Sequence, residues 1–412
     1  MRFVLPALAV VAVSFGSVHA DDKEFFFKPN DRVVFLGDSI TEQYQYSTYM
    51  ELFLTTRYPE GKFTFLNAGI GGDTAHGGLA RFQKHVLDEK PTALTINFGM
   101  NDGGYGKFDE KRNQLYREST EKMLKMAKDA NVRVALCSPN AIDTRVKTDG
   151  KVYFETQKQF YAPLKQIAAS HGASFADQYG RTRAEIEKMT KDDPSAKTAK
   201  PYYDGFHTSE PGALIMAHAI LTELKAPALV SSVEFATKGD AKTQKCKVTD
   251  LKASETGATF TRLDDSLPMP MLEKWKPMLP YINNLKDLND YGLKITGLAE
   301  GKYEVLADGK TVASYTAKEL ADGVNLALAS SGPMYDQGVK VFEAIQQKNS
   351  FVAARFFSVH RFNPPAWLKV PDLDAQKKTE LDRIMKVVDD RQNAVNAAVK
   401  PVAHKWEVKL AK

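Results

Sequence analysis

The sequence predicts an α/β fold in the first half of the chain, followed by a smaller β-rich unit and C-terminal helices. Two observations predict this order. From Asp31 to about Leu224, short apolar runs that end in glycine or polar residues alternate with longer stretches of helical spacing. Beyond Ala226 this alternation stops: strand-like runs follow one another, and a helical pattern begins after Pro333. Alternating strands and helices are typical of a parallel sheet with helices on both faces and right-handed crossovers.

The elements of the first half follow from hydrophobic periodicity. Short β-branched runs predict five strands, over residues 32–37, 63–67, 94–98, 132–137 and 173–176. Between and after them, apolar residues recur at helical spacing, which predicts helices over 46–57, 79–88, 110–129, 156–170 and 210–224.

In the second half, strand-like runs predict a small antiparallel, sandwich-like unit, interrupted by the proline-rich stretch 267–280. The strands are expected over 230–236, 246–251, 258–262, 293–296, 303–307 and 310–315. Asp308-Gly309 joins the last two as a hairpin turn. After Pro371, one apolar stripe predicts a long helix, either with a packing face or with a partner interface: Leu381, Ile384, Met385, Val388, Val395 and Val399.

The chain therefore divides into four predicted parts: a leader over 1–20, an α/β domain over 21–225, a β-rich region over 226–330 and a helical region over 331–412. In the leader, Arg2 precedes an apolar run over 3–15, and Val18-His19-Ala20 is typical of a signal-peptidase site. The run is shorter than the roughly 20 residues of a membrane span, so we expect a cleaved signal peptide and a secreted or periplasmic protein rather than an uncleaved anchor. No later segment is expected to cross a membrane.

Composition excludes several classes of protein. The 412 residues are 43% hydrophobic and 26% charged, which is typical of globular rather than disordered chains. Lysine and arginine total 56 against 51 acidic residues, without a basic stripe, so we expect no nucleic-acid partner. Cys137 and Cys246 lie far apart in apolar, strand-like surroundings, which favours two buried free thiols over a bridge between them. The histidines do not cluster, so no metal is expected. The oligomeric state stays open.

Chemistry is expected beyond the carboxyl ends of the strands, where loops and helix N-termini converge. The first strand ends in Gly37-Asp38-Ser39-Ile40, which places the Ser39 hydroxyl where free backbone N–H groups can hold a negative oxygen. Ser39 is thus a candidate nucleophile. The alternative is that Asp38 or Ser39 only caps the next helix.

Polar residues and glycines also follow the second and third strands. The stretch 67–74 contains Gly71-Gly72, which lets the main chain approach a bound group closely, or which forms a plain tight turn. The stretch Gly99-Met100-Asn101-Asp102 places a carboxamide at the neighbouring strand end. Asn101 is either a hydrogen-bond donor to a ligand or a turn residue that bonds its own backbone.

The last stretch is Asp204-Gly205-Phe206-His207, just before the final helix of the first half. Its spacing lets a carboxylate orient an imidazole, as in the orienter and base of a nucleophilic triad, although a surface Asp–His contact would have the same spacing. Because a hydroxyl, a glycine turn, a carboxamide and an Asp–His pair all lie at predicted strand ends or helix starts, a shared site is favoured over separate local roles.

Together these stretches resemble the sequence blocks of the SGNH, or GDSL-like, hydrolase superfamily, in the family's order. The correspondence covers about 31–224, with Ile40 in place of the commoner Leu. The resemblance implies a flavodoxin-like three-layer α/β/α sandwich and no organic or metal cofactor. It also implies an oxyanion hole made by the backbone N–H groups of Ser39 and Gly72 and the side-chain amide of Asn101. The remainder looks like the appended region of some bacterial secreted members.

The expected function is a serine ester hydrolase in which His207 deprotonates Ser39 and Asp204 steadies the imidazolium. Export and the appended region favour a carbohydrate O-acetyl esterase, with an acylated polysaccharide or small molecule as substrate. The alternatives are a lipase or acylhydrolase, an acyltransferase that uses the same residues, and a non-catalytic carbohydrate-binding surface protein. Aromatic residues near the four stretches either stack on sugar rings or are buried against the sheet: Tyr44, Tyr46, Tyr49, Tyr105, Tyr202, Tyr203 and Phe206.

Overall fold

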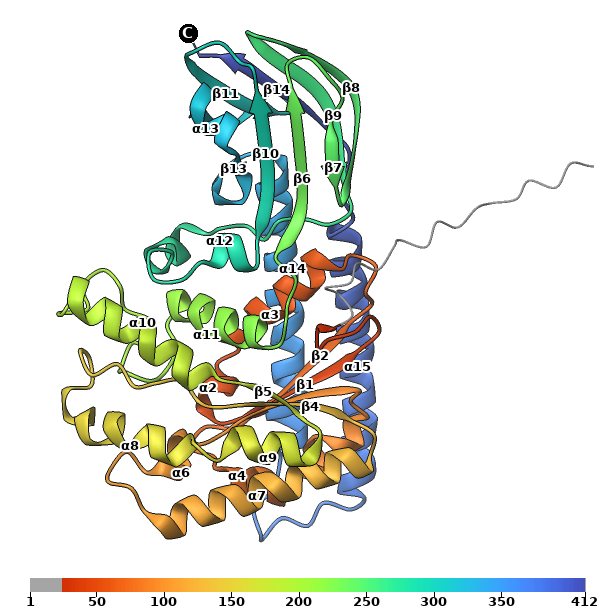
Figure 1. The fold of residues 1–412 in the computed structure, drawn as a ribbon. Helices are drawn as coiled ribbons and strands as arrows, with labels where there is room; N and C mark the ends of the chain where they lie inside the picture. Colours follow the sequence, from red (N-terminus) through yellow and green to blue (C-terminus); the bar gives the residue numbers. More distant parts are fainter. Residues whose placement is uncertain (1–23, 412) are drawn as a thin grey trace, which may run out of the picture.

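The computed structural model describes residues 24–411, so the expected leader over 1–20 lies outside the described residues. Figure 1 shows an α/β unit below, β-rich sheets above it, and two long helices, α14 and α15, that run alongside the α/β unit. Within residues 24–411, none of the helices combines the length and the apolar character that a bilayer span requires.

The lower unit is built on one parallel sheet in the order β2-β1-β3-β4-β5. Its strands are β1 (Arg32–Gly37), β2 (Thr64–Gly69), β3 (Ala93–Asn97), β4 (Arg133–Cys137) and β5 (Ser174–Ala176). This is the flavodoxin-like order, so the predicted fold class is confirmed. Gly37 pairs with both Gly69 and Asn97, which brings the carboxyl ends of β1, β2 and β3 to one edge.

Among the differences between the observed and the predicted helices of this unit, three have a clear physical reason. The predicted helix over 79–88 is broken at Arg81, whose guanidinium reaches back to main-chain oxygens of the sheet. The predicted helix over 156–170 is two helices, because Pro163 cannot continue the first. Helix α10 was not predicted, because its buried face includes polar Thr182 and Glu185. The observed helices are α2 (Ser39–Glu42), α3 (Gln45–Arg57), α4 (Ala75–Ala80), α5 (Phe82–His85), α6 (Met100–Gly103), α7 (Glu110–Asp129), α8 (Lys151–Tyr161), α9 (Leu164–His171), α10 (Gln178–Asp192) and α11 (Glu210–Glu223).

The β-rich part contains two sheets, in the orders β13-β10-β6-β7 and β12-β11-β14-β9-β8. Asp308 and Gly309 both have positive φ, as a tight hairpin turn requires, so that predicted turn is confirmed. The strands are β6 (Leu229–Ala236), β7 (Lys242–Gln244), β8 (Cys246–Ser254), β9 (Gly257–Asp264), β10 (Asp290–Thr296), β11 (Lys302–Ala307), β12 (Lys310–Thr316), β13 (Val324–Asn325) and β14 (His404–Leu410).

Two expectations for this part were wrong. The unit is not purely antiparallel, because β6 and β10 pair in parallel; the long connection between them allows the chain to return in the same direction. The region 331–412 is not all helical, because β14 lies between β9 and β11. His404, Trp406 and Val408 are buried at every second position of β14, which is the strand period.

The C-terminal helices α14 (Pro333–Ala354) and α15 (Leu373–Ala398) pack on the α/β unit, and a π-helical turn, Arg355–His360, extends α14. Apolar residues of both helices belong to the same core cluster as the parallel sheet. The stripe on α15 is a packing face, with Ile384, Val388 and Val395 buried. The boundaries of the domains remain predictions, since residues on both sides of them share a core.

Both cysteines are free thiols, as expected, but only Cys137 is fully buried; Cys246 is partly exposed on β8. Burial raises the pKa of the Cys137 thiol to about 12, so this thiol stays protonated at neutral pH.

Candidate active site

Ser39 stands at the point where β1 turns into α2. The carboxylate of Asp38 caps this short helix, since its Oδ1 accepts the Ile40 N–H at 3.0 Å. The Ser39 hydroxyl is not used as a cap: its Oγ lies 2.8 Å from Nε2 of His207. A side chain at Gly37 would collide with Thr41, so glycine is required for α2 to pack this closely against the strand end.

His207 is held by the aspartate three residues before it. Nδ1 of His207 lies 2.6 Å from Oδ2 of Asp204, and Oδ1 accepts the backbone N–H groups of Phe206 and His207. Burial raises the pKa of Asp204, but hydrogen bonds from the His207 ring and from these N–H groups outweigh it and lower the pKa below its usual value. The carboxylate is therefore ionised at neutral pH and fixes Nδ1 of His207 as a donor.

The loop that carries His207 is tied to the loop after β4. The backbone N–H of Asp143 donates to the carbonyl of Gly205 at 2.7 Å, and the Asn140 side chain donates to the carbonyl of Phe206 at 3.1 Å. Gly205 has a φ of +98° and no space for a side chain against Asp143 and Lys147. The position of His207 thus depends on residues more than 60 positions earlier in the sequence.

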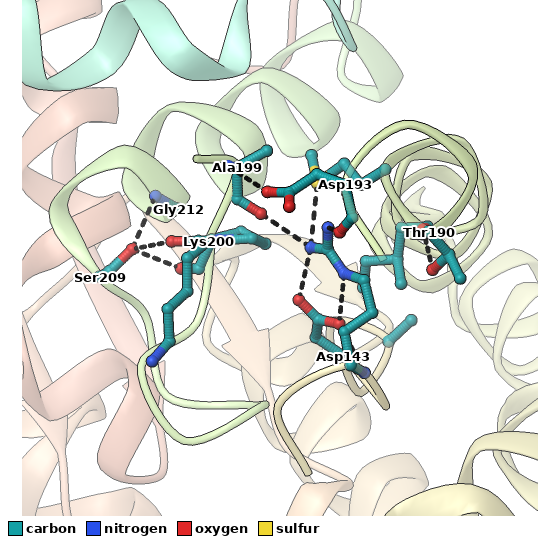
Figure 2. A network of polar contacts seen from close by, with 12 residues as sticks. Asp143, Thr190, Asp193, Ala199, Lys200, Ser209 and Gly212 are labelled. Atoms are coloured by element: carbon teal, nitrogen blue, oxygen red, sulfur yellow. Dashed lines mark hydrogen bonds and ion pairs between the residues drawn. The ribbon is translucent and has the colours of Figure 1, made fainter. Parts of the chain in front are cut away.

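A buried ion pair holds the segment that leads into this loop (Figure 2). The Arg145 guanidinium donates to both oxygens of Asp143 and to the carbonyls of Asp193 and Ala199. The Asp193 carboxylate in turn accepts the Ala199 N–H at 2.9 Å. At the other end, Ser209 Oγ donates to the carbonyl of Lys200 and caps α11. Both ends of the segment 193–209 are therefore fixed.

Asn101 links the first three predicted stretches. Its Nδ2 donates to the carbonyl of Asp73 at 2.9 Å and lies 3.4 Å from Oδ2 of Asp38, while Tyr105 donates to its Oδ1 at 3.1 Å. Asp73 directly follows Gly72. A side chain at Gly72 would meet no other atom, so the reason for glycine at this position is its positive φ of +72° and not a lack of space. Asn101 thus contacts Asp38 and Asp73, which are the sequence neighbours of Ser39 and Gly72.

Two buried carboxyl groups lie at this edge of the parallel sheet. Burial raises the pKa of Asp38 to about 7 and that of Asp102 to about 7. Asp73 instead pairs with Arg81 at 2.8 Å, and Arg81 also donates to the carbonyls of Ala68 and Gly37, which ties together the ends of β2 and β1. Sequence reasoning missed Asp73 and Arg81, since no local pattern indicates that a helical arginine reaches the sheet.

The aromatic residues near the site fall into two groups. Tyr46, Tyr49 and Tyr202 are buried, which fits the packing alternative. Tyr203 is 52% exposed, and its ring stacks on that of His207 with centroids 5.7 Å apart. The centroid of the Phe206 ring lies 4.4 Å from that of the His207 ring. Tyr203 and Phe206, with partly exposed Tyr44 and Tyr105, therefore remain available for contact with a substrate.

Three histidines outside the candidate site contact acidic side chains. His360 contacts Glu89, His218 contacts Asp287 and His404 contacts Asp308. Over residues 24–411, no group of three or more histidine, cysteine, aspartate or glutamate side chains is arranged to hold a metal ion.

Comparison with known proteins identifies a family that matches the α/β unit. Residues 35–215 match the GDSL-like Lipase/Acylhydrolase family. An acetylxylan esterase of Geobacillus stearothermophilus is 26% identical over 216 residues, which cover 47% of this chain and 94% of the relative. The Thioesterase 1/protease 1/lysophospholipase L1 of Escherichia coli K12 is 26% identical over 166 residues, 40% of this chain and 70% of the relative.

One solved structure shares the fold over nearly the whole chain. It is that of a gut microbial diltiazem-metabolizing enzyme, with a TM-score of 0.79 at 23% identity, and the alignment covers 93% of this chain and 98% of the other. The appended sheets and helices therefore belong to a fold that occurs elsewhere together with this α/β unit. The match over 35–215 places the α/β unit of this chain in the GDSL-like Lipase/Acylhydrolase family, and with the esterase relatives it shows a hydrolase that acts on ester bonds.

Proposed function

We propose that this protein is an exported serine esterase that removes acetyl groups from carbohydrate, with Ser39 as nucleophile, His207 as general base and Asp204 as its orienting carboxylate. The observation that carries the proposal is one line of contacts: Ser39 Oγ lies 2.8 Å from His207 Nε2, and His207 Nδ1 lies 2.6 Å from Asp204 Oδ2. Both distances are within hydrogen-bond reach of a nucleophile and its base.

In the first half of the reaction, Ser39 Oγ forms a bond to the acyl carbon while its proton passes to Nε2 of His207. The tetrahedral intermediate then expels the alcohol oxygen, which takes that proton from His207 and leaves the acyl group on Ser39. In the second half, water attacks the acyl carbon, gives its proton to His207, and acetic acid leaves when Ser39 regains the proton. Asp204 stabilises the imidazolium in both halves because its carboxylate stays ionised.

The negative oxygen of each intermediate needs hydrogen-bond donors. The backbone N–H groups of Ser39 and Gly72 and the Nδ2 group of Asn101 are the proposed donors. This role is supported by the contact of Asn101 with Asp38 and Asp73, the residues that flank the other two donors. Asn101 is held there by Tyr105, so the donor is oriented before a substrate binds.

The substrate class rests on two supports. The relative from Geobacillus stearothermophilus is named an acetylxylan esterase. In this chain, exposed Tyr203 and partly exposed Phe206 both contact the His207 ring, and flat aromatic faces suit sugar rings. Export is supported by the leader expected over 1–20 and by a 76-residue match, at 41% identity, to a protein of Bacillus subtilis named uncharacterized lipoprotein YqeF.

Hydrolysis of p-nitrophenyl acetate by the wild type and by Ser39→Ala tests the nucleophile, with Ser170→Ala as a matched serine on the exposed surface of α9. Ser39→Ala should lose nearly all activity and Ser170→Ala none. Equal rates for all three would overturn the proposal. Release of acetate from acetylated xylan, compared with release of palmitate from p-nitrophenyl palmitate, then tests the substrate class; faster palmitate release would favour an acylhydrolase of lipids.

A further inference from the structure

A pocket with a volume of about 280 Å³ lies beside the proposed active site, between the start of α3, the first turn of α11, the 3-10 turn Glu273–Met278 and the middle of α14. Two of its four walls therefore come from the appended part of the chain. The volume is just below the ~300–1,000 Å³ of sites for drug-sized ligands, so it suits one small ring better than a long chain.

Gln43 joins this pocket to the active site, because it lines the pocket and contacts the residues around His207. Its backbone N–H donates to the Ser39 carbonyl at 3.0 Å. Its side-chain Oε1 accepts the Thr208 N–H at 3.2 Å, and its Nε2 donates to the Tyr203 hydroxyl at 3.3 Å. A substrate with its ester at Ser39 would reach the pocket by extending past Gln43.

The side chains of the pocket combine uncharged hydrogen-bonding groups with aromatic rings. Carboxamides and hydroxyls line it, from Gln43, Gln45, Gln346, Asn349, Thr48 and Ser350. Its aromatic part is a chain of edge contacts, in which Trp275 lies 5.0 Å from Tyr49 and 5.5 Å from Phe342 between ring centroids. A sugar ring offers hydroxyl groups at its rim and an apolar face, which match this combination.

The two charged groups of the pocket neutralise each other. Lys274 and Glu210 form an ion pair at 2.6 Å across the boundary between the 3-10 turn and α11. Lys274 also lies over the Phe342 ring, 5.6 Å from its centroid. No net charge is therefore presented by these side chains, which favours a neutral occupant over an anion or a cation.

The wall that α14 contributes is fixed in advance. Lys348 and Glu51 form an ion pair between α14 and α3, and both side chains are at most 2% exposed. Asn349, the next residue, donates to Thr48 Oγ1 and to Glu51 Oε2, each at 3.1 Å. A buried pair with satisfied hydrogen bonds holds the two helices in one register, so the pocket needs little rearrangement to bind.

We infer that this pocket is a subsite for a neutral, hydroxyl-bearing sugar ring in the alcohol part of the ester, one or more rings away from the acetyl group. The inference rests on the proposed function. It assigns the appended helix α14 a role in choosing the substrate, while the atoms that react belong to the α/β unit.

The test fills the pocket from its solvent side. Ser350 lines the pocket and is exposed on α14, so Ser350→Trp adds bulk there without disturbing the core. Gln347→Trp places the same side chain on an exposed position of α14 that does not line the pocket. The substrates are acetylated xylo-oligosaccharides and p-nitrophenyl acetate, and the measured quantity is the ratio of the two kcat/KM values.

We expect Ser350→Trp to lower this ratio at least about tenfold, mainly through a higher KM for the oligosaccharide, and Gln347→Trp to leave it unchanged. An unchanged ratio for Ser350→Trp would overturn the subsite. So would a wild type that cleaves p-nitrophenyl acetate but not the oligosaccharides, although the chemistry at Ser39 would then stand. Failure of the proposed function is distinct, because the wild type would then cleave neither substrate.

Discussion

Two histidines in different parts of the molecule are held by an aspartate in nearly the same way. Nδ1 of His207 lies 2.6 Å from Asp204, and Nδ1 of His404 lies 2.7 Å from Asp308. In both pairs the aspartate also accepts a backbone N–H, from His207 itself or from Lys405. In both, these hydrogen bonds outweigh burial and lower the pKa of the carboxyl below its usual value.

The pairs differ in what the second ring nitrogen meets. His207 Nε2 faces the Ser39 hydroxyl at 2.8 Å. His404 Nε2 is buried, and within the described chain it has no hydrogen-bond partner. The first pair lies at the carboxyl edge of the parallel sheet, while the second joins the start of β14 to a hairpin turn. An Asp–His pair is therefore not a site by itself; its neighbours decide whether the imidazole can move a proton.

The largest expected effect separates the two histidines. His207→Ala should lower kcat/KM for p-nitrophenyl acetate by about 10⁴- to 10⁶-fold, because the nucleophile then has no base. His404→Ala should leave it within about twofold, since changes far from the site act independently. Steady-state kinetics of both purified variants check this. A loss of similar size in both variants would mean that the contrast between the pairs is wrong.

Substitution of the two aspartates should show the same contrast, with kcat lowered only by the change at Asp204. Asp204→Asn should lower kcat by about 10⁴-fold, because an amide no longer selects the tautomer of His207 that accepts the Ser39 proton. Asp308→Asn, the matched change in the other pair, should not alter kcat. Single-turnover measurements with both variants would detect the difference, and a fully active Asp204→Asn variant would contradict the assigned role.

The Asp204–His207 pair has the carboxamide of Asn101 in its surroundings, and among the described residues the Asp308–His404 pair lacks such a group. Asn101→Ala should reduce kcat by about 100- to 1,000-fold, or roughly 3–4 kcal/mol, with little change in KM, because its donor acts in the transition state. Asn393→Ala, on the exposed surface of α15, is the control. If KM rises and kcat is unaffected, Asn101 binds the ground state and is not an oxyanion donor.

Acid should lower stability through both Asp–His pairs, but it should lower activity only through the Asp204–His207 pair. A carboxyl whose pKa is lowered on folding adds stability above its unfolded value, near 3.8, and this stability is lost as pH falls through the folded value. Asp308→Asn should therefore flatten the fall of Tm below about pH 4 and leave the pH–rate profile unchanged. Asp204→Asn should change both. Thermal melts from about pH 2 to 6, read beside rate profiles, separate the two cases.

The smallest effect concerns the second pair alone. His404→Phe removes the hydrogen bond to Asp308 but also the buried nitrogen without a partner, so we expect a loss of only about 1 kcal/mol in the free energy of unfolding. Urea unfolding measures it. A loss above about 3 kcal/mol would show that His404 stabilises the sheet far more than one hydrogen bond does.

Local sequence patterns were sufficient to predict much of the structure of the first half of the chain. The strand over 32–37 and the helix over 110–129 begin and end where hydrophobic periodicity placed them. The Asp204–His207 contact was also foreseeable, since its partners are three residues apart. The spacing alone did not distinguish a site contact from a plain surface pair. The distinction depends on Ser39, which lies 168 positions away from His207.

Periodicity, caps and turns act within a few residues, so the sequence alone was enough to identify the α/β order, the hairpin at Asp308-Gly309 and the polar residues at the strand ends. Contacts between distant segments have no such local signal. The place of β14 between β9 and β11, the parallel pairing of β6 with β10 and the Lys348–Glu51 pair emerged only with the tertiary structure. In each case the partner is chosen by packing among many possible alternatives, and packing depends on the whole chain.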